Sequence, residues 1–222
     1  MFRKLALAFG VAIPVALAIF WFTLPDVRPL AKRFPSSTAF MERRRQALAN
    51  SGLSTRLEWK PVGLARISPA MQRAVVAAED ARFWEHDGVD WSAIRTAAAQ
   101  DWDRGRISHG GSTITQQLAK NLYLSPARTP WRKLRELAIA WRLENELSKR
   151  RILELYLNVV EFGPRTYGVE AAARRYFGKP ASALSESEAS TLAAMIPSPR
   201  IYDPVRHPGR VERRARRIRR WM

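Results

Sequence analysis

Cysteine is absent from this sequence of 222 residues, and histidine is scarce. Without cysteine the chain can form neither disulfides nor thiolate zinc sites. Of the three histidines, His86, His109 and His207, none has a second at ligand spacing, so a histidine-built metal site is not expected. Acidic residues are also few, since 20 Asp and Glu accompany 38 Lys and Arg, and the net charge is +18. Such a surface attracts anions, which include nucleic acid, lipid headgroups and phosphate-bearing substrates.

The composition otherwise favours one folded domain with a short appendage, because 46% of residues are hydrophobic. Residues 5–24 form one long apolar run without a charged residue. This run just reaches the length of about 20 residues that a membrane-spanning helix needs. It exceeds the core of about 7–15 residues that is usual in cleaved signal peptides. We therefore predict a cytoplasmic tip and transmembrane anchor at residues 1–24.

The remaining sequence predicts a mainly α protein with few strand patterns. Residues 25–67 are punctuated by prolines and are interpreted as a connector, with one short basic helix at 40–49. Helix signals then recur through residues 68–200. They are Ser68-Pro69 for a helix to Glu79, a Thr113/Gln116 capping box, Thr129-Pro130 before an apolar stripe (Leu134, Leu137, Trp141, Leu147), Ser148, a stop at Gly178, and a Ser185/Glu188 capping box. A small hairpin is expected, but no pattern places it.

The last segment, residues 201–222, is rich in arginine. Val211, Ala215, Ile218 and Met222 fall on one face of a predicted helix there. A basic amphipathic helix of this kind fits a membrane surface and fits docking on its own domain equally well. The pattern leaves both interpretations open.

Two segments carry candidate chemistry near the start of the helical region. Glu79-Asp80 ends a predicted helix beside aromatic residues, where burial would raise a carboxyl pKa toward that of a general base. The residues alone fit an acidic helix end in solvent better than a functional acid. Glycines at 110–111 precede the helix start at Thr113, whose free N–H groups suit an anion. Glycine before a helix is common, so this signal is weak by itself.

Two further segments follow. Arg132 and Glu136 lie four apart on a helix, which by spacing alone favours a surface ion pair over a site for pyrophosphate. In the next helix Tyr156, with Ile152 and Leu155, is predicted to be core.

Together these segments resemble the ordered motifs of a known family. The stretches EDxRFxxHxGxD, GGSTITQQLAKN, RKxxE, KRRILELYLN and YGVEAAARRYFGK follow one another within about residues 68–200. They are similar to the family-51 peptidoglycan glycosyltransferases, which include monofunctional biosynthetic enzymes and the amino-terminal domains of class A penicillin-binding proteins. GGSTITQQLAKN is unusually specific to that family.

The resemblance implies a lysozyme-like, two-lobed glycosyltransferase domain at residues 68–200. It implies polymerisation of lipid II into β-1,4-linked glycan strands with release of polyprenyl diphosphate. Glu79 is implied as general base, Glu136 as the second active-site carboxylate and Glu154 as structural support. Substrate-binding roles are implied for Asp80, His86, Ser112, Thr113, Gln116, Gln117, Lys120, Asn121, Arg128, Arg132 and Lys133.

The resemblance also bears on cofactors, partners and location. The sequence shows no dedicated metal site and requires no cofactor, although a divalent cation, Mg²⁺ or Mn²⁺, near Glu136 is possible and is proposed within the family. The expected partners are lipid II, the growing lipid-linked glycan strand, the membrane, and cell-wall synthesis or division proteins, with no nucleic acid. The expected location is the bacterial inner membrane, spanned once, with the catalytic domain on the periplasmic face.

One departure and three alternatives accompany this interpretation. Residues 163–168 read GPRTYG where bifunctional members often have GRGxYG, so no role is transferred to Arg165. No room for a transpeptidase domain follows the fifth motif, which favours the monofunctional type. The alternatives are a lysozyme-like hydrolase or lytic transglycosylase, a non-catalytic membrane protein that binds nucleic acid, and an inactive scaffold of the division or elongation machinery.

Overall fold

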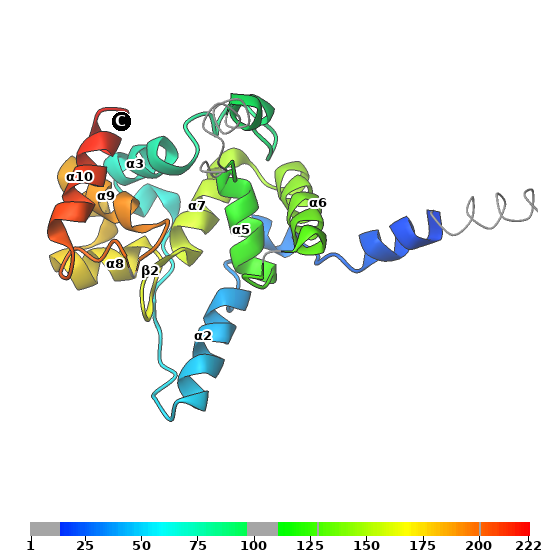
Figure 1. Ribbon diagram of the computed structural model, residues 1–222, viewed down its shortest axis with the longest axis horizontal. Coiled ribbons are helices and arrows are strands. Elements are labelled where there is room, and N and C mark those ends of the chain that lie inside the picture. The colour runs from blue at the N-terminus through cyan, green and yellow to red at the C-terminus, as the bar shows by residue number, and fades with distance from the viewer. Residues whose placement is uncertain (1–13, 97–110, 128, 200) are drawn as a thin grey trace, which may run out of the picture.

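The computed structural model describes residues 14–96, 111–127, 129–199 and 201–222, and within them the chain is mainly helical, as predicted. The helices gather in two groups (Figure 1). One group holds α3 (Pro69–Glu79), α8 (Val169–Phe177), α9 (Glu186–Met195) and α10 (Pro208–Arg219). The other holds α5 (Ile114–Tyr123) and α6 (Pro130–Glu146). Helix α7 (Lys149–Val159) lies between them and packs on α5, α6 and α8.

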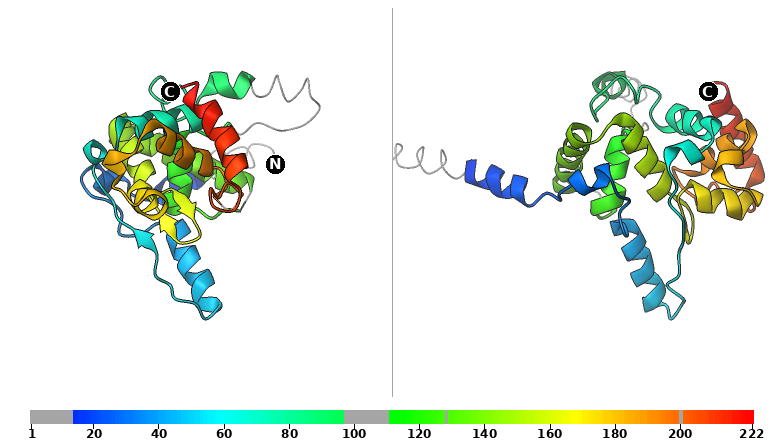
Figure 2. Two further views of the ribbon diagram at one scale, coloured as in Figure 1. Left: turned by 90° about the vertical axis from the view of Figure 1, so that its left-hand side faces the viewer. Right: turned by 180° about the vertical axis from the view of Figure 1, so that it is seen from behind.

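The remaining elements are short. Helix α2 (Ala39–Asn50) extends away from the body, as Figures 1 and 2 show. Strands β2 (Glu161–Gly163) and β3 (Thr166–Tyr167) form the hairpin that the sequence did not place, and β1 (Glu58–Trp59) joins β3 in parallel. The described part of the chain also has short 3₁₀ turns at η1 (Arg28–Ala31), η2 (Leu64–Arg66) and η3 (Ala181–Ala183).

Helix starts follow the local signals closely. The side chains of Ser68, Thr129, Ser148 and Ser185 each accept the backbone N–H three residues on. The Ser185 box is complete, and Gly178 ends α8 in the left-handed conformation. The Thr113 box was wrong in its second half. Thr113 does accept from the Gln116 N–H, but the side-chain oxygen of Gln116, which a capping box would use, accepts instead from Lys133 Nζ at 2.8 Å, and Nε2 donates to the carbonyl of Gly88.

The apolar stripe predicted on α6 was largely wrong. Leu134 and Trp141 are 48% and 54% exposed, and only Leu147 of the stripe is buried. The helix instead buries Ile139, Ala140 and Leu143, together with Glu136. The aromatic side of α6 therefore faces outward.

The amino-terminal segment is described only in part. Residues 14–22 are helical and project from the body (Figure 1), whereas residues 1–13 of the predicted anchor lie outside the described residues. Within the described ranges no helix is both long enough and apolar enough to cross a membrane.

One hydrophobic core joins segments from the whole length of the described chain. Leu24 and Val27, before the helical region, belong to it, and so do Val211 and Ile218 of α10. Helix α10 packs along α9 and touches α3, with its apolar face buried. Of the two interpretations of the basic tail, docking on its own domain is the observed one. The proposed division at residues 24, 67 and 200 stays a prediction.

Candidate active site

Glu79 is the last residue of α3, and its side chain is only 9% exposed. Gln117 of α5 donates from Nε2 to Oε2 of Glu79 at 2.9 Å. Arg214 of α10 places Nη2 3.5 Å from Oε1. Burial raises the pKa of the Glu79 carboxyl above its usual value, against the hydrogen bond from Gln117 and the charges of Arg214 and Lys120. A carboxyl whose pKa is raised above its usual value suits a general base.

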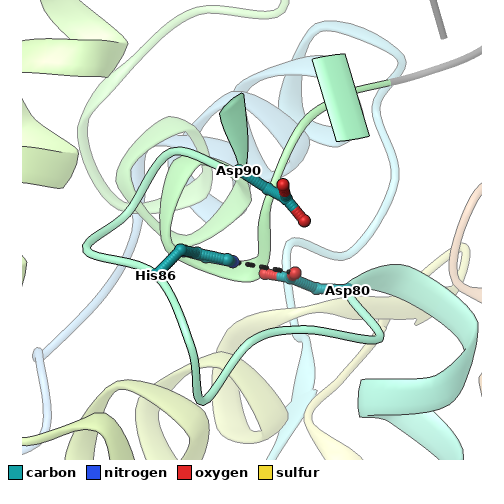
Figure 3. Close-up of side chains that lie close together, drawn as sticks. All are labelled: Asp80, His86 and Asp90. Carbon is teal, nitrogen blue, oxygen red and sulfur yellow. Dashed lines mark hydrogen bonds and ion pairs between the residues drawn. The ribbon is translucent and has the colours of Figure 1, made fainter. Parts of the chain in front are cut away.

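Asp80 connects the end of α3 to the start of α5. Its Oδ2 accepts the backbone N–H of Ile114 at 3.0 Å, in the first turn of α5. Its Oδ1 lies 2.9 Å from Nε2 of His86 (Figure 3). Both side chains are buried. They hold Glu79 and the amino end of α5 in one arrangement.

Asp90 lies beside this pair, and Figure 3 shows the three side chains close together. One ligand atom from each of Asp80, His86 and Asp90 falls within 4.8 Å of the others, which is a possible metal arrangement. However, the guanidinium of Arg82 pairs with both oxygens of Asp90. The contacts of Asp80 and Asp90 are therefore those of a satisfied hydrogen-bond network, and they do not fit a cation.

A buried ionic cluster lies on α6. Glu136 is 2% exposed and pairs with Arg132 through one oxygen and with Lys133 through the other, at 2.6 Å for Lys133. Lys133 also donates to Oε1 of Gln116 at 2.8 Å and approaches Ser112 Oγ at 3.3 Å. The surface ion pair favoured by spacing alone was wrong, because this pair is buried against α5. Since each Glu136 oxygen already binds a cation, a divalent ion on Glu136 does not fit these residues.

Lys120 faces the same cluster from α5. Burial lowers the pKa of Lys120, and its charge interacts with Glu136, Arg132 and Lys133. The Nε of Arg132 is buried and has no partner among the described residues. Three cations and an unpaired N–H thus collect on the side of α5 and α6 toward Glu79, which is a suitable environment for an anion.

Two pockets flank this arrangement. One of about 300 Å³ is lined by Glu79, Asp80, Ser112 and Thr113 among others. A second of about 320 Å³ is lined by residues that include Gln117, Lys120 and Asn121. The end of α3 and the residues just before α5 line the first pocket, and the middle of α5 lines the second.

Other residues singled out from the sequence have more structural surroundings. Thr113 donates to the carbonyl of Gly88 as well as capping α5. Glu154 accepts the backbone N–H of Leu64 at 2.5 Å and pairs with Arg151, contacts that suit its predicted supporting role. Arg128 lies outside the described residues.

Two residues at the site were not identified from the sequence. Tyr156 was interpreted only as core, yet its hydroxyl contacts Gln117. Arg214 was one of many arginines in the tail. The sequence did contain one indication of its role. Arg214 precedes Ala215, which is on the predicted apolar face, so its side chain was expected at the edge of the buried face, where a cation is usually paired with an acid.

The comparisons with known proteins agree with one another. The sequence model of the family described as Transglycosylase matches residues 45–222. The chain is similar to proteins named "Biosynthetic peptidoglycan transglycosylase". The one from Laribacter hongkongensis is 49% identical over 85% of this chain and 82% of its own length. The one from Methylobacillus flagellatus is 52% identical over 83% and 80%. The one from Thiobacillus denitrificans is 48% identical over 96% and 93%.

Proposed function

We propose that this chain polymerises lipid II with Glu79 as the general base, since it belongs to the transglycosylase family and is a peptidoglycan glycosyltransferase of cell-wall synthesis. The acceptor is a lipid-linked disaccharide with a free 4-hydroxyl. The donor is the growing strand on its polyprenyl diphosphate. The observation that carries the proposal is the buried carboxyl of Glu79, whose pKa is raised and which lines a pocket together with Ser112 and Thr113, just before α5.

The reaction forms one bond and breaks another at the anomeric carbon. Glu79 takes the proton of the acceptor 4-hydroxyl while the oxygen of that hydroxyl attacks C1 of the donor. The bond from C1 to the diphosphate oxygen breaks on the opposite face, so the configuration inverts from α to β. This matches the geometry of inverting glycosidases, with a sugar hydroxyl in place of water.

The leaving diphosphate needs charge stabilisation more than a proton. Lys120, Arg132 and Lys133 supply positive charge, and the unpaired Nε of Arg132 offers a further donor. Glu136 holds Arg132 and Lys133 together, since without a buried anion the two cations would repel each other. In this proposal Glu136 acts by positioning these cations.

The test uses the full chain in detergent with labelled lipid-linked disaccharide pentapeptide, and products are separated by size. The wild type is expected to make long glycan. Glu79→Gln is expected to lose activity by about 10³-fold or more, because a positioned base contributes about 10²–10⁴-fold. Glu85→Gln, a neighbouring exposed acid, is the matched control and is expected to retain activity. Shortening of preformed glycan instead of growth would favour the lytic alternative.

We further propose that the protein is anchored in the inner membrane by residues 5–24, with the catalytic domain outside. The outward side of α6 supports this, because Trp131, Leu134 and Trp141 are each about half exposed. The adjacent helical segment packs on the same side. Phe20 stacks edge-on against Trp131 at 5.2 Å, and Trp21 against Trp141 at 5.3 Å. Exposed tryptophans beside an apolar segment are typical of a membrane interface.

A further inference from the structure

A chain of two hydrogen bonds crosses three helices behind the proposed base. The hydroxyl of Tyr156, on α7, donates to Oε1 of Gln117 at 2.9 Å. The Nε2 of Gln117, on α5, donates to Oε2 of Glu79 at 2.9 Å. Tyr156 is fully buried, so this series of hydrogen bonds ends inside the hydrophobic core. The Tyr156 hydroxyl is therefore separated from the proposed base by the Gln117 side chain alone, and it does not itself line the pocket.

The direction of donation in these two hydrogen bonds is determined by the groups at both ends, Tyr156 and Glu79. Burial raises the pKa of Tyr156 well above its usual value, with the charges of Glu79 and Asp80 acting in the same direction. The phenol therefore stays neutral and keeps a proton to donate. An ionised Glu79 can only accept. The Gln117 amide between them satisfies both neighbours in one orientation only, with oxygen toward Tyr156 and nitrogen toward Glu79.

The alternative orientation of the amide would favour the protonated acid. If Gln117 turned over, its oxygen would accept from a protonated Glu79 and its nitrogen would face the phenol oxygen. The Tyr156 hydroxyl would then lose its acceptor inside the core, which is costly for a buried donor. Without the Tyr156 hydroxyl this barrier to turning disappears. A donor toward Glu79 favours the charged carboxylate, and an acceptor favours the neutral acid.

We propose that Tyr156 is a positioning residue for the transfer reaction, which fixes the Gln117 amide as a donor to Glu79 and so keeps this base ionised and aimed. The proposal rests on the role of Glu79 given above. Other groups also face Glu79. They are Lys120 from α5, Arg214 from α10 and the neighbouring Asp80. Tyr156 differs from these because it carries no charge and acts only through Gln117.

The test compares the pH dependence of kcat/KM for wild type and Tyr156→Phe in glycan polymerisation. The acidic limb reports the base in the free enzyme. It is expected to move up by about one pH unit, because the Gln117 amide is no longer held as a donor to the Glu79 carboxylate. Below the limb kcat/KM then falls about tenfold, and at high pH it returns to near the wild-type value. A defect of folding alone would lower activity at every pH.

Tyr176→Phe is the matched control. Tyr176 also donates one hydrogen bond, to the carbonyl of Phe162 at 3.0 Å, but from α8. This variant loses a tyrosine hydroxyl without touching Gln117, and its acidic limb is expected to stay in place. A shift of equal size in both variants would overturn the proposal.

The route through Gln117 is tested by a double variant. In the Gln117→Ala background, Tyr156→Phe is expected to cause no further shift, because residues that act in series are not additive. A full additional shift there, or an unmoved limb in Tyr156→Phe alone, would overturn the positioning role. Loss of polymerisation in Glu79→Gln tests the base independently, so the base assignment can stand while the role of Tyr156 fails.

Discussion

At the residue scale, Asp90 and Glu79 show how neighbours decide the protonation of a buried carboxyl. Burial alone would raise the pKa of Asp90, but hydrogen bonds from Arg82, the Ala93 N–H and Ser92 hold it at about 2. At Glu79 burial dominates, because Gln117 supplies only one neutral donor and Arg214 lies 3.5 Å away. The first arrangement stabilises the fold, and the second suits proton transfer.

The pair of Asp90 with Arg82 predicts a specific acid dependence of stability. Because the folded pKa lies below the unfolded value of about 3.9, the ionised group stabilises the fold above pH 4. This contribution is lost as the pH falls toward 2. Asp90→Asn is expected to lower the urea midpoint at pH 6, with the difference from wild type shrinking between pH 4 and pH 2.

The exposed Asp87→Asn is the control for that measurement, and its midpoint is expected to follow the wild type. A difference for Asp90→Asn that stays constant from pH 6 to pH 2 would contradict the assignment.

Two glycines with positive φ, Gly168 and Gly178, allow a comparison of backbone strain with and without a steric clash. Gly168 has φ +77°, and a Cβ there would lie 2.6 Å from the backbone carbonyl oxygen of Asn158. Gly178 has φ +68°, and a Cβ there meets nothing within 4 Å. Gly178→Ala is therefore expected to cost about 1–2 kcal/mol from its conformation alone. Gly168→Ala is expected to cost clearly more, and equal unfolding midpoints in urea would contradict the clash.

The sequence predicted part of this candidate site. The family resemblance, and not the residues alone, implies Glu79 as the general base. Tyr156 and Arg214 were not identified, because a tyrosine in an apolar helix and an arginine among many give no local sign of their partner. Their roles depend on which helices pack together, and this is a tertiary property.

At the element scale, the starts of helices were predictable and their buried faces were less so. A cap is formed by residues three apart, so Ser148 and Ser185 carry the signal locally. Which side of α6 is buried depends on where α5 lies. Hydrophobic periodicity alone predicted that the aromatic side would be buried. That side is exposed because α6 buries an ion pair, Glu136 with Arg132, in place of part of its apolar surface.

Asn158 of α7 provides a prediction at this scale. Its buried side chain accepts the N–H of Val62 at 2.8 Å and donates to the carbonyl of Val62 at 2.9 Å, so it ties α7 to the segment before η2. Asn158→Ala leaves two buried backbone groups unpaired and is expected to cost about 3 kcal/mol. Urea denaturation checks this, with the exposed Asn50→Ala as control. A loss below about 0.5 kcal/mol would contradict the structural role of Asn158.

At the scale of the whole molecule, charge and apolar surface act together in the proposed membrane association. The net charge of +18 draws the protein toward anionic headgroups, and the aromatic side of α6 offers apolar contact. In the chain shortened to residues 20–222, where the proposed anchor no longer holds the protein to the bilayer, Trp131→Ser with Trp141→Ser is expected to weaken binding to anionic vesicles by at least tenfold at high salt, because screening leaves the apolar contact dominant.

Trp221→Ser is the control for that measurement, since Trp221 is 77% exposed but follows α10 in the other group of helices. Binding to vesicles by sedimentation, at low and high salt, separates the two contributions. Equal loss in both variants would contradict an orientation set by α6.

The docking of α10 also has a consequence for the order in which the enzyme becomes complete. Synthesis runs from the amino terminus, so α3 with Glu79 leaves the ribosome long before α10. Until α10 has been made and has packed along α9, Glu79 has no Arg214 beside it, and the core lacks Val211 and Ile218. The nascent chain therefore holds its acid early and gains the opposing cation only after α9 and α10 have been made, which delays a finished site.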